Sequence, residues 1–127
     1  MPGGESTTMS MLLVSSGLFD ELAERIGHGM PVFGTCAGLI LLSSTIEDGR
    51  PDQKCFGRID MTVQRNGYGR QIESFEGDLD TSLFDTPLHA VFIRAPRVTE
   101  VGEDVDVLAR DKHGDPVLVR QGNALAA

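Results

Sequence analysis

The segment Gly34-Thr35-Cys36-Ala37-Gly38 places a nucleophile between two glycines, where a short apolar strand is expected to meet a helix. Such an elbow forces the nucleophile into a sharp turn, and glycine on either side leaves room for the backbone to approach. The unpaired N–H groups and the dipole at the helix start favour the thiolate of Cys36 over its thiol. The backbone N–H of Ala37 would then donate to an oxyanion. The pattern predicts a nucleophilic cysteine and leaves open a buried, inert one.

The second candidate is the N-terminal run Pro2-Gly3-Gly4-Glu5-Ser6-Thr7-Thr8, a glycine turn that leads into a helix capped by Ser or Thr. It lacks the lysine of a P-loop, and Glu5 would repel a phosphate. An acidic residue on a loop of N–H groups suits a zwitterion better, because the carboxylate can engage a cationic nitrogen or an amide while a neighbouring N–H holds an oxyanion. A plain glycine turn with a helix cap stays open as the alternative.

Other residue types offer weaker candidates. The segments Arg65-Asn66-Gly67-Tyr68-Gly69-Arg70 and Phe92-Ile93-Arg94-Ala95-Pro96 carry arginines that could bind a carboxylate with two parallel hydrogen bonds. The three histidines, at positions 28, 89 and 113, lie in contexts that favour solvated or structural roles over a base for Cys36. Only Cys36 and Cys55 are cysteines, and no cluster of Cys and His offers four ligands, so neither a metal site nor a disulfide framework is predicted.

Two kinds of periodicity place these residues on elements. Up to about residue 47, apolar residues at helical spacing predict helices around 9–13 and 18–26, then a strand at 31–34 and a helix at 37–44. Strand, tight turn and helix in this order indicate an α/β fold. In the first helix, Met9, Leu12 and Leu13 lie at positions i, i+3 and i+4.

After residue 47 the period changes to two. Ile59, Met61 and Val63 fall on one face of a predicted strand. Further strands are predicted at 90–94, 105–109 and 116–120, and the turn His113-Gly114-Asp115 joins the last two into a hairpin. The polar stretch 67–80 is predicted to be loop with one short strand near Ser74 and Phe75.

Length and charge exclude several classes of protein. A chain of 127 residues suits a single domain. Eleven Lys and Arg against nineteen Asp and Glu give a net charge of −8, which argues against nucleic acids and membranes as partners. The longest apolar runs, such as 39–42, have four residues and are far shorter than the roughly 20 that span a bilayer. We see no signal peptide and expect a cytoplasmic protein.

Taken together, these motifs resemble the class I (triad) glutamine amidotransferases, and within them the glutaminase subunits of pyridoxal 5′-phosphate synthase. The general amidotransferase elbow usually has glutamine at the position of Ile40, and its replacement here favours this subfamily. The matching blocks, in chain order, are 2–9, 33–42, 65–71, 73–76, 91–96 and 120–122.

The resemblance implies a reaction and roles for residues. Cys36 would attack the side-chain amide of L-glutamine, form a thioester and release ammonia, and Gly4 and Ala37 would supply the oxyanion hole. The ammonia would pass to a synthase partner that builds pyridoxal 5′-phosphate. Neither a metal nor an organic cofactor is implied. The residues that the resemblance assigns to glutamine binding are Gly3, Gly4, Glu5, Arg65, Ile93 and Arg94.

The resemblance also implies a flavodoxin-like α/β sheet with helices on both faces. Family members have a strand before the Pro-Gly-Gly-Glu block, and a His-Pro-Glu segment with a closing helix after the Arg-Gln-Gly block. We therefore expect residues 1–127 to be one partial amidotransferase domain, a fragment without the general base and its carboxylate. Two alternatives stay open: an inactive remnant that binds the synthase partner or glutamine, and another elbow-based cysteine hydrolase of the same broad fold.

Overall fold

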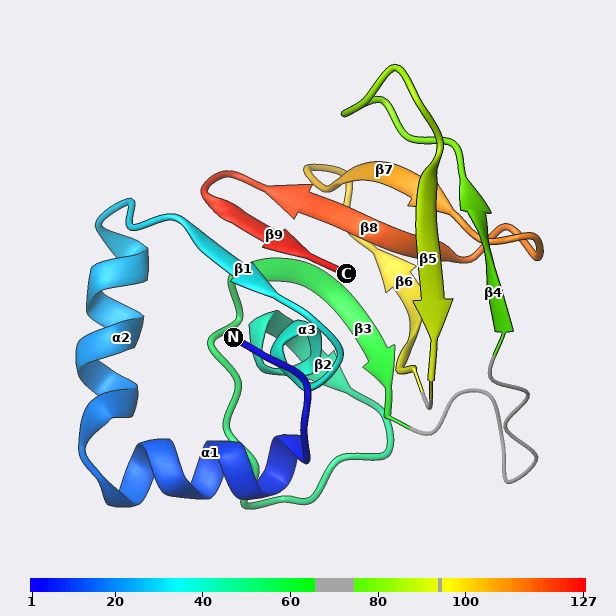
Figure 1. Ribbon diagram of the computed structural model, residues 1–127. Coiled ribbons are helices and arrows are strands. Elements are labelled where there is room, and N and C mark those ends of the chain that lie inside the picture. The colour runs from blue at the N-terminus through cyan, green and yellow to red at the C-terminus, as the bar shows by residue number, and fades with distance from the viewer. Residues whose placement is uncertain (66–74, 94) are drawn as a thin grey trace.

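The computed structural model describes residues 1–65, 75–93 and 95–127, and it is a mixed α/β structure, as predicted (Figure 1). Its strands form three sheets, with the orders β1-β9-β8-β7, β2-β3-β6 and β4-β5. In chain order the elements are α1 (Ser6–Ser15), α2 (Leu18–Gly27), β1 (Val32–Gly34), α3 (Ala37–Leu42), β2 (Ser43–Ile46), β3 (Ile59–Gln64), β4 (Phe75–Leu79), β5 (Leu88–Phe92), β6 (Arg97–Val101), β7 (Asp106–Arg110), β8 (Pro116–Gln121) and β9 (Ala124–Ala126).

The four-stranded sheet carries β1, the strand that leads to the elbow. β1 pairs in parallel with β9, in a register that places Val32 opposite Ala124, and β8 runs antiparallel to both β9 and β7. The predicted hairpin of the last two strands is confirmed as β7 and β8. Both chain ends bond to β1: the Met1 ammonium donates to the carbonyl of Phe33 at 2.8 Å, and the N–H of Ala127 donates to that of Gly34 at 2.9 Å.

Helix α3 is buried on every side. Its sequence, Ala-Gly-Leu-Ile-Leu-Leu, is apolar all round, as expected of a helix enclosed by other elements. It contacts β1, β9, β2 and α1. The predicted helix over 37–44 is two residues too long, because β2 begins at Ser43. The hydroxyl of Ser43 donates to the carbonyl of Ile40 at 2.7 Å, which satisfies a carbonyl of the last helical turn.

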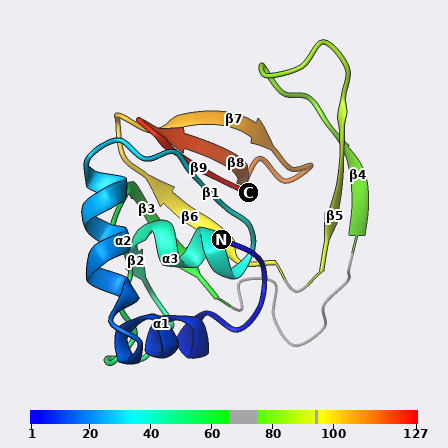
Figure 2. The ribbon, with the colours of Figure 1, turned by 60° about the vertical axis from the view of Figure 1, so that its left-hand side comes forward.

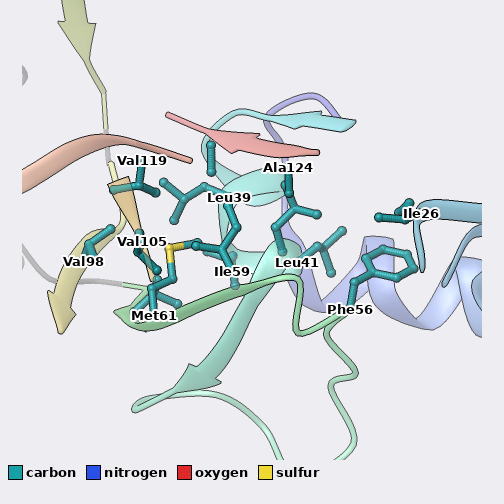
Figure 3. Packing of buried hydrophobic residues seen from close by; sticks show 14 of the residues in the cluster. Ile26, Leu39, Leu41, Phe56, Ile59, Met61, Val98, Val105, Val119 and Ala124 are labelled. Atoms are coloured by element: carbon teal, nitrogen blue, oxygen red, sulfur yellow. The ribbon is translucent and has the colours of Figure 1, made fainter. Parts of the chain in front are cut away.

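The main core joins α3 to both larger sheets. Figure 3 shows Leu39 and Leu41 of α3 between β3, which contributes Ile59 and Met61, and the strands of the first sheet. Ile59, Met61 and Val63 are at most 2% exposed, so the period of two read from the sequence is confirmed.

The helix predicted from Met9, Leu12 and Leu13 is confirmed as α1, but these residues are not its most buried ones. The buried residues are Ser6, Thr7 and Ser10, whereas Leu12 is 62% exposed, and Met9 and Leu13 are half-buried against the main core. The inner face meets a polar loop, residues 49–57, so hydroxyl groups pack there by hydrogen bonding. In α2, whose helical spacing was read from Leu18, Leu22 and Ile26, the structure buries Ile26 and also Phe19, whereas Leu18 is 49% exposed.

Several strands differ from the prediction. β5 begins two residues early, at Leu88, and β4 occupies 75–79, where mostly loop was expected. Residues 67–74 of that stretch lie outside the described residues. Strands β2, β6 and β9 were not predicted, since each is short and is held by pairing with a distant strand.

The hairpin of β4 and β5 forms a separate two-stranded sheet. It stands beside the rest of the structure rather than joining either larger sheet (Figure 2). In both ribbon views the N- and C-termini lie close to each other, next to the end of β1. Within the described residues, no helix is long and apolar enough to cross a membrane.

Candidate functional site

Cys36 occupies a strained turn between β1 and α3. Its φ of 52° and ψ of −106° lie in a region that residues with a Cβ rarely adopt, and it is the one non-glycine residue with positive φ in the described chain. Backbone bonds hold the turn: the N–H of Thr35 donates to Met1 at 3.0 Å, and that of Cys36 donates to Ala127 at 2.9 Å. The sharp elbow predicted from the sequence is therefore present.

The glycines on either side of the elbow are required for close backbone approach. A Cβ placed on Gly34 would lie 2.6 Å from the carbonyl carbon and oxygen of Gly38, and 2.8 Å from a methyl group of Leu42. Gly38 in turn lies directly against Met1, with no room for a Cβ. The prediction that both positions need glycine is confirmed.

The N-terminal glycine turn lies against the sulfur. A Cβ on Gly3 would be 3.4 Å from Cβ and 4.0 Å from Sγ of Cys36. Gly4 has a φ of 152°, which favours glycine, and leads directly into Glu5 and α1. As the first residue of α3, Ala37 has an N–H with no acceptor inside its helix. The structure thus brings the proposed nucleophile beside the turn, as expected from the sequence.

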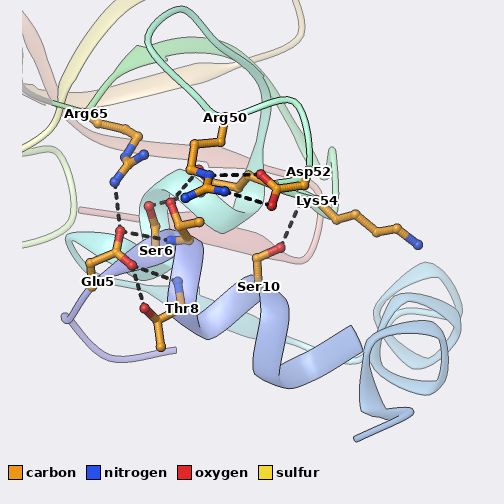
Figure 4. A network of polar contacts seen from close by, with 10 residues as sticks. Glu5, Ser6, Thr8, Ser10, Arg50, Asp52, Lys54 and Arg65 are labelled. Carbon is orange, nitrogen blue, oxygen red and sulfur yellow. Dashed lines mark hydrogen bonds and ion pairs between the residues drawn. The ribbon is translucent and has the colours of Figure 1, made fainter. Parts of the chain in front are cut away.

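Glu5, rather than a Ser or Thr, caps α1. One carboxylate oxygen accepts from the N–H of Thr7 at 3.1 Å, and the other accepts from both the N–H and the hydroxyl of Thr8 at 2.7 Å (Figure 4). The hydroxyl of Thr8, then its N–H and that of Thr7, lower the pKa of Glu5 from 4.5 to about 2. The carboxylate therefore stays ionised throughout the physiological range.

The lowered pKa gives a pH prediction for Glu5→Gln. Above pH 4.5 the ionised cap should stabilise the native protein over the variant by about 1 kcal/mol, a modest value because the side chain is half-exposed. As pH falls from 4.5 towards 2, the native carboxylate stays ionised while the unfolded one takes up a proton, so this advantage should shrink. Urea denaturation of both proteins at pH 7, 4 and 2.5 measures it, and a difference that grows towards low pH would contradict the assignment.

Arg65 lies at the end of β3 and joins the N-terminal turn. Its Nη2 donates to Glu5 at 2.7 Å, and the pair is drawn in Figure 4. Its backbone N–H donates to the carboxylate of Asp48 at 2.6 Å. A guanidinium has five N–H donors, so one bond to Glu5 leaves capacity to bind a second carboxylate. The other candidate arginine, Arg94, lies outside the described residues.

An apolar cavity of about 260 Å³ opens beside Cys36. One wall is the elbow, another is the β4–β5 hairpin with the exposed Ile93 that follows it, and the third is β8. Ile93 was predicted from the sequence, but the β8 wall was not, because it is apolar at successive positions and carries no local signal of a site. The lining comprises Thr35, Cys36, Leu39, Leu79, Leu88, Ala90, Val91, Phe92, Ile93, Ala95, Pro96, Val98, Pro116, Val117, Leu118 and Ala127.

Cys55 and the histidines lie elsewhere. The half-buried thiol of Cys55 donates to the carbonyl of Ile40 at 3.3 Å, and burial raises its pKa, which disfavours the thiolate. His89 lies between carboxylates of the exposed hairpin, and its bond to Asp78 raises its pKa. No histidine is among the residues that line the cavity, and within residues 1–65, 75–93 and 95–127 no group of His, Cys, Asp and Glu could hold a metal ion.

Comparison with known proteins decides the family. The family model described as SNO glutamine amidotransferase matches residues 1–127. The chain belongs to this family. A pyridoxal 5′-phosphate synthase subunit PdxT of Mycobacteroides abscessus is 61% identical over 99% of the chain, and those of Nocardioides sp. and Corynebacterium jeikeium are 55% and 54% identical over 99% and 98%.

A solved structure described as a crystal structure of glutamine amidotransferase has the same fold. It superposes with a TM-score of 0.89 at 48% identity and covers 99% of the chain. The chain spans about 65% of the length of these three PdxT relatives and 66% of the solved chain. The amidotransferase resemblance inferred from the elbow and the Pro-Gly-Gly-Glu block is confirmed.

Proposed function

We propose that this chain is the glutaminase part of a pyridoxal 5′-phosphate synthase, hydrolysing L-glutamine to glutamate and ammonia through a cysteine thioester. The observation that carries the proposal is the contact between the two predicted motifs: the Gly3-Gly4 turn lies against a cysteine held at positive φ at the start of a buried helix. The names of the PdxT relatives support the same function.

The proposed reaction follows the order of bonds made and broken. Sγ of Cys36 attacks the side-chain carbonyl carbon of glutamine, and the negative charge moves to the oxygen, which the N–H groups of Ala37 and Gly4 would stabilise. The tetrahedral intermediate collapses, the carbon–nitrogen bond breaks, and ammonia leaves after its nitrogen gains a proton. Water then hydrolyses the thioester to glutamate and frees the thiol. The resemblance assigns proton transfer to the His-Pro-Glu segment that other members of the family carry.

The substrate's α-carboxylate and α-amino group need charged partners. We propose that Arg65, with Arg94, binds the carboxylate, because a guanidinium matches its geometry. Glu5 holds the guanidinium of Arg65 at 2.7 Å and adds negative charge for the α-amino group. Ile93 would pack against the substrate from the cavity wall, and Gly3 leaves space beside the sulfur.

The fold and the partner complete the proposal. The parallel pair β1 and β9, with α3 packed on it, supports a flavodoxin-like sheet of the triad amidotransferase type. Ammonia would pass to a synthase subunit that incorporates it into pyridoxal 5′-phosphate. We assign no cofactor to the glutaminase step, since the thiol, N–H donors and water account for its chemistry.

Ammonia release by two forms of the protein tests the proposal: the chain itself, and the chain inserted in place of the matched residues of the M. abscessus relative. Each is mixed with that relative's synthase subunit and glutamine, beside its Cys36→Ser control. We expect turnover in at least one form that falls by a factor on the order of 10⁴ in the control. Turnover unchanged in the control would contradict the mechanism. Absence of turnover in both forms would favour a protein that only binds its partner or glutamine.

A further inference from the structure

The loop after β2 connects the two halves of the proposed site. We infer that Gln53, in this loop, is a positioning residue that sets the distance between the N-terminal glycine turn and the elbow. The inference rests on the proposed function, because it concerns the two N–H donors assigned to the oxyanion hole. Gln53 itself is not among the residues that line the cavity.

On one side, the loop binds the first turns of α1. Nε2 of Gln53 donates to the hydroxyl of Ser6 at 2.9 Å, and Oε1 accepts from the hydroxyl of Thr7 at 3.2 Å. One helical turn further on, the N–H of Lys54 donates to the hydroxyl of Ser10 at 2.8 Å. These three hydroxyl-bearing residues are the buried face of α1, with exposed fractions of 6% or less.

On its other side, the loop is fixed to α3. The N–H of Phe56 donates to the carbonyl of Leu41 at 2.7 Å, and that of Arg58 donates to Leu42 at 2.9 Å. The ring of Phe56 also stacks on Phe19 of α2, with centroids 4.4 Å apart. The residues after Gln53 therefore move with the helix that begins at the elbow.

This arrangement makes the loop a spacer between α1 and α3. Gly4 lies just before α1 and Ala37 is the first residue of α3, so the position of α1 along its axis sets how far apart their N–H groups lie. An apolar face could slide by fractions of an ångström without losing contact, whereas hydrogen bonds fail outside a narrow range of distance and angle. The two bonds of Gln53 fix the first turn of α1 directly next to the glycine turn.

The fall in kcat expected when the N–H of Gly4 is displaced can be estimated from the effects of similar changes in other enzymes. Loss of one oxyanion-hole donor lowers kcat by roughly 10²–10³-fold, and a shift of about 1 Å can lower it by about 10²-fold. A loosened α1 should weaken rather than abolish the donation from Gly4. We therefore expect a fall in kcat of about 10–100-fold without Gln53, with a much smaller change in KM.

Three variants test this in whichever form of the protein shows glutamine turnover that requires Cys36. Gln53→Met keeps the length of the side chain and removes both hydrogen bonds. Gln53→Glu keeps two acceptor oxygens, to which both hydroxyls can donate after rotation. Gln121→Met is the matched control, because it removes another long-range side-chain bond, the one from the N–H of Asp60 at 2.6 Å, far along the chain from α1.

We expect kcat to fall about 10–100-fold in Gln53→Met, and by less than about threefold in Gln53→Glu and Gln121→Met, with KM within about threefold throughout. A kcat for Gln53→Met within about twofold of the parent would overturn the inference, as would an equal loss in Gln53→Glu. The melting temperatures of all three variants distinguish a positioning role of Gln53 from a purely structural one. A purely structural role would lower the melting temperature without lowering kcat at a nearly constant KM. Absence of Cys36-dependent turnover in the parent would instead refute the proposed function.

Discussion

Gly34→Ala is expected to destabilise the protein by about 3 kcal/mol or more, a large fraction of the roughly 5–15 kcal/mol by which native proteins are stable. The new Cβ would lie 2.6 Å from backbone atoms of Gly38, which cannot move aside as the end of a flexible side chain could. The clash could be relieved only if β1 and α3 moved apart, and α3 is buried on all sides. Urea denaturation followed by circular dichroism measures the change.

Gly77→Ala is the matched control for this clash. Gly77 lies in β4, and a Cβ there would meet no other atom within 4 Å. Its substitution should change the free energy of unfolding by less than about 1 kcal/mol. If Gly34→Ala were no more destabilising than Gly77→Ala, β1 and α3 would not be in the close contact described for the elbow.

Cys36→Gly is expected to abolish glutamine hydrolysis and still give a more stable protein than Cys36→Ala. Loss of a hydrolase nucleophile lowers kcat by a factor on the order of 10⁴ to 10⁶. At an ordinary position glycine is less stable than alanine by about 0.5–1 kcal/mol. At φ 52° and ψ −106° the order should reverse by about 1 kcal/mol, because glycine has no Cβ to strain this conformation.

The comparison of Cys36→Gly with Cys36→Ala measures the effect of backbone strain on stability, because both variants lack the sulfur. Thermal and urea denaturation of the two variants under the same conditions give the sign directly. An alanine variant more stable than the glycine variant would mean that residue 36 is unstrained, and the elbow would lose its physical basis.

The elbow could be predicted from the sequence because its cause is local. Two glycines around a cysteine, between an apolar strand and an apolar helix, are a local signal for a sharp turn, and the structure has that turn. The alternation of Ile59, Met61 and Val63 was predictable for the same reason, since a half-buried strand repeats every two residues.

The buried face of α1, strand β9 and the cavity wall of β8 could not be predicted, because each depends on residues far away along the chain. Leu12 is exposed while Ser10 is fully buried, because the inner face of α1 meets a loop more than 40 residues away that offers Gln53 and a backbone N–H. No pattern within α1 encodes that loop. β9 is a strand because it pairs with β1. The cavity wall contributed by β8 forms only when the sheet that contains β8 packs beside the β4–β5 hairpin.

Covalent capture of Cys36 by a diazoketone analogue of glutamine tests the central claim most directly. The analogue presents a diazo carbon where glutamine has its amide nitrogen. Once that carbon takes up a proton, a thiolate in a glutamine site displaces N2 from it and forms a stable thioether. Peptide mass spectrometry should find one adduct per chain, on the peptide containing Cys36, with labelling suppressed by glutamine and absent in Cys36→Ser. Labelling of Cys55 at an equal rate, or labelling of Cys36 that glutamine leaves unchanged, would contradict the account.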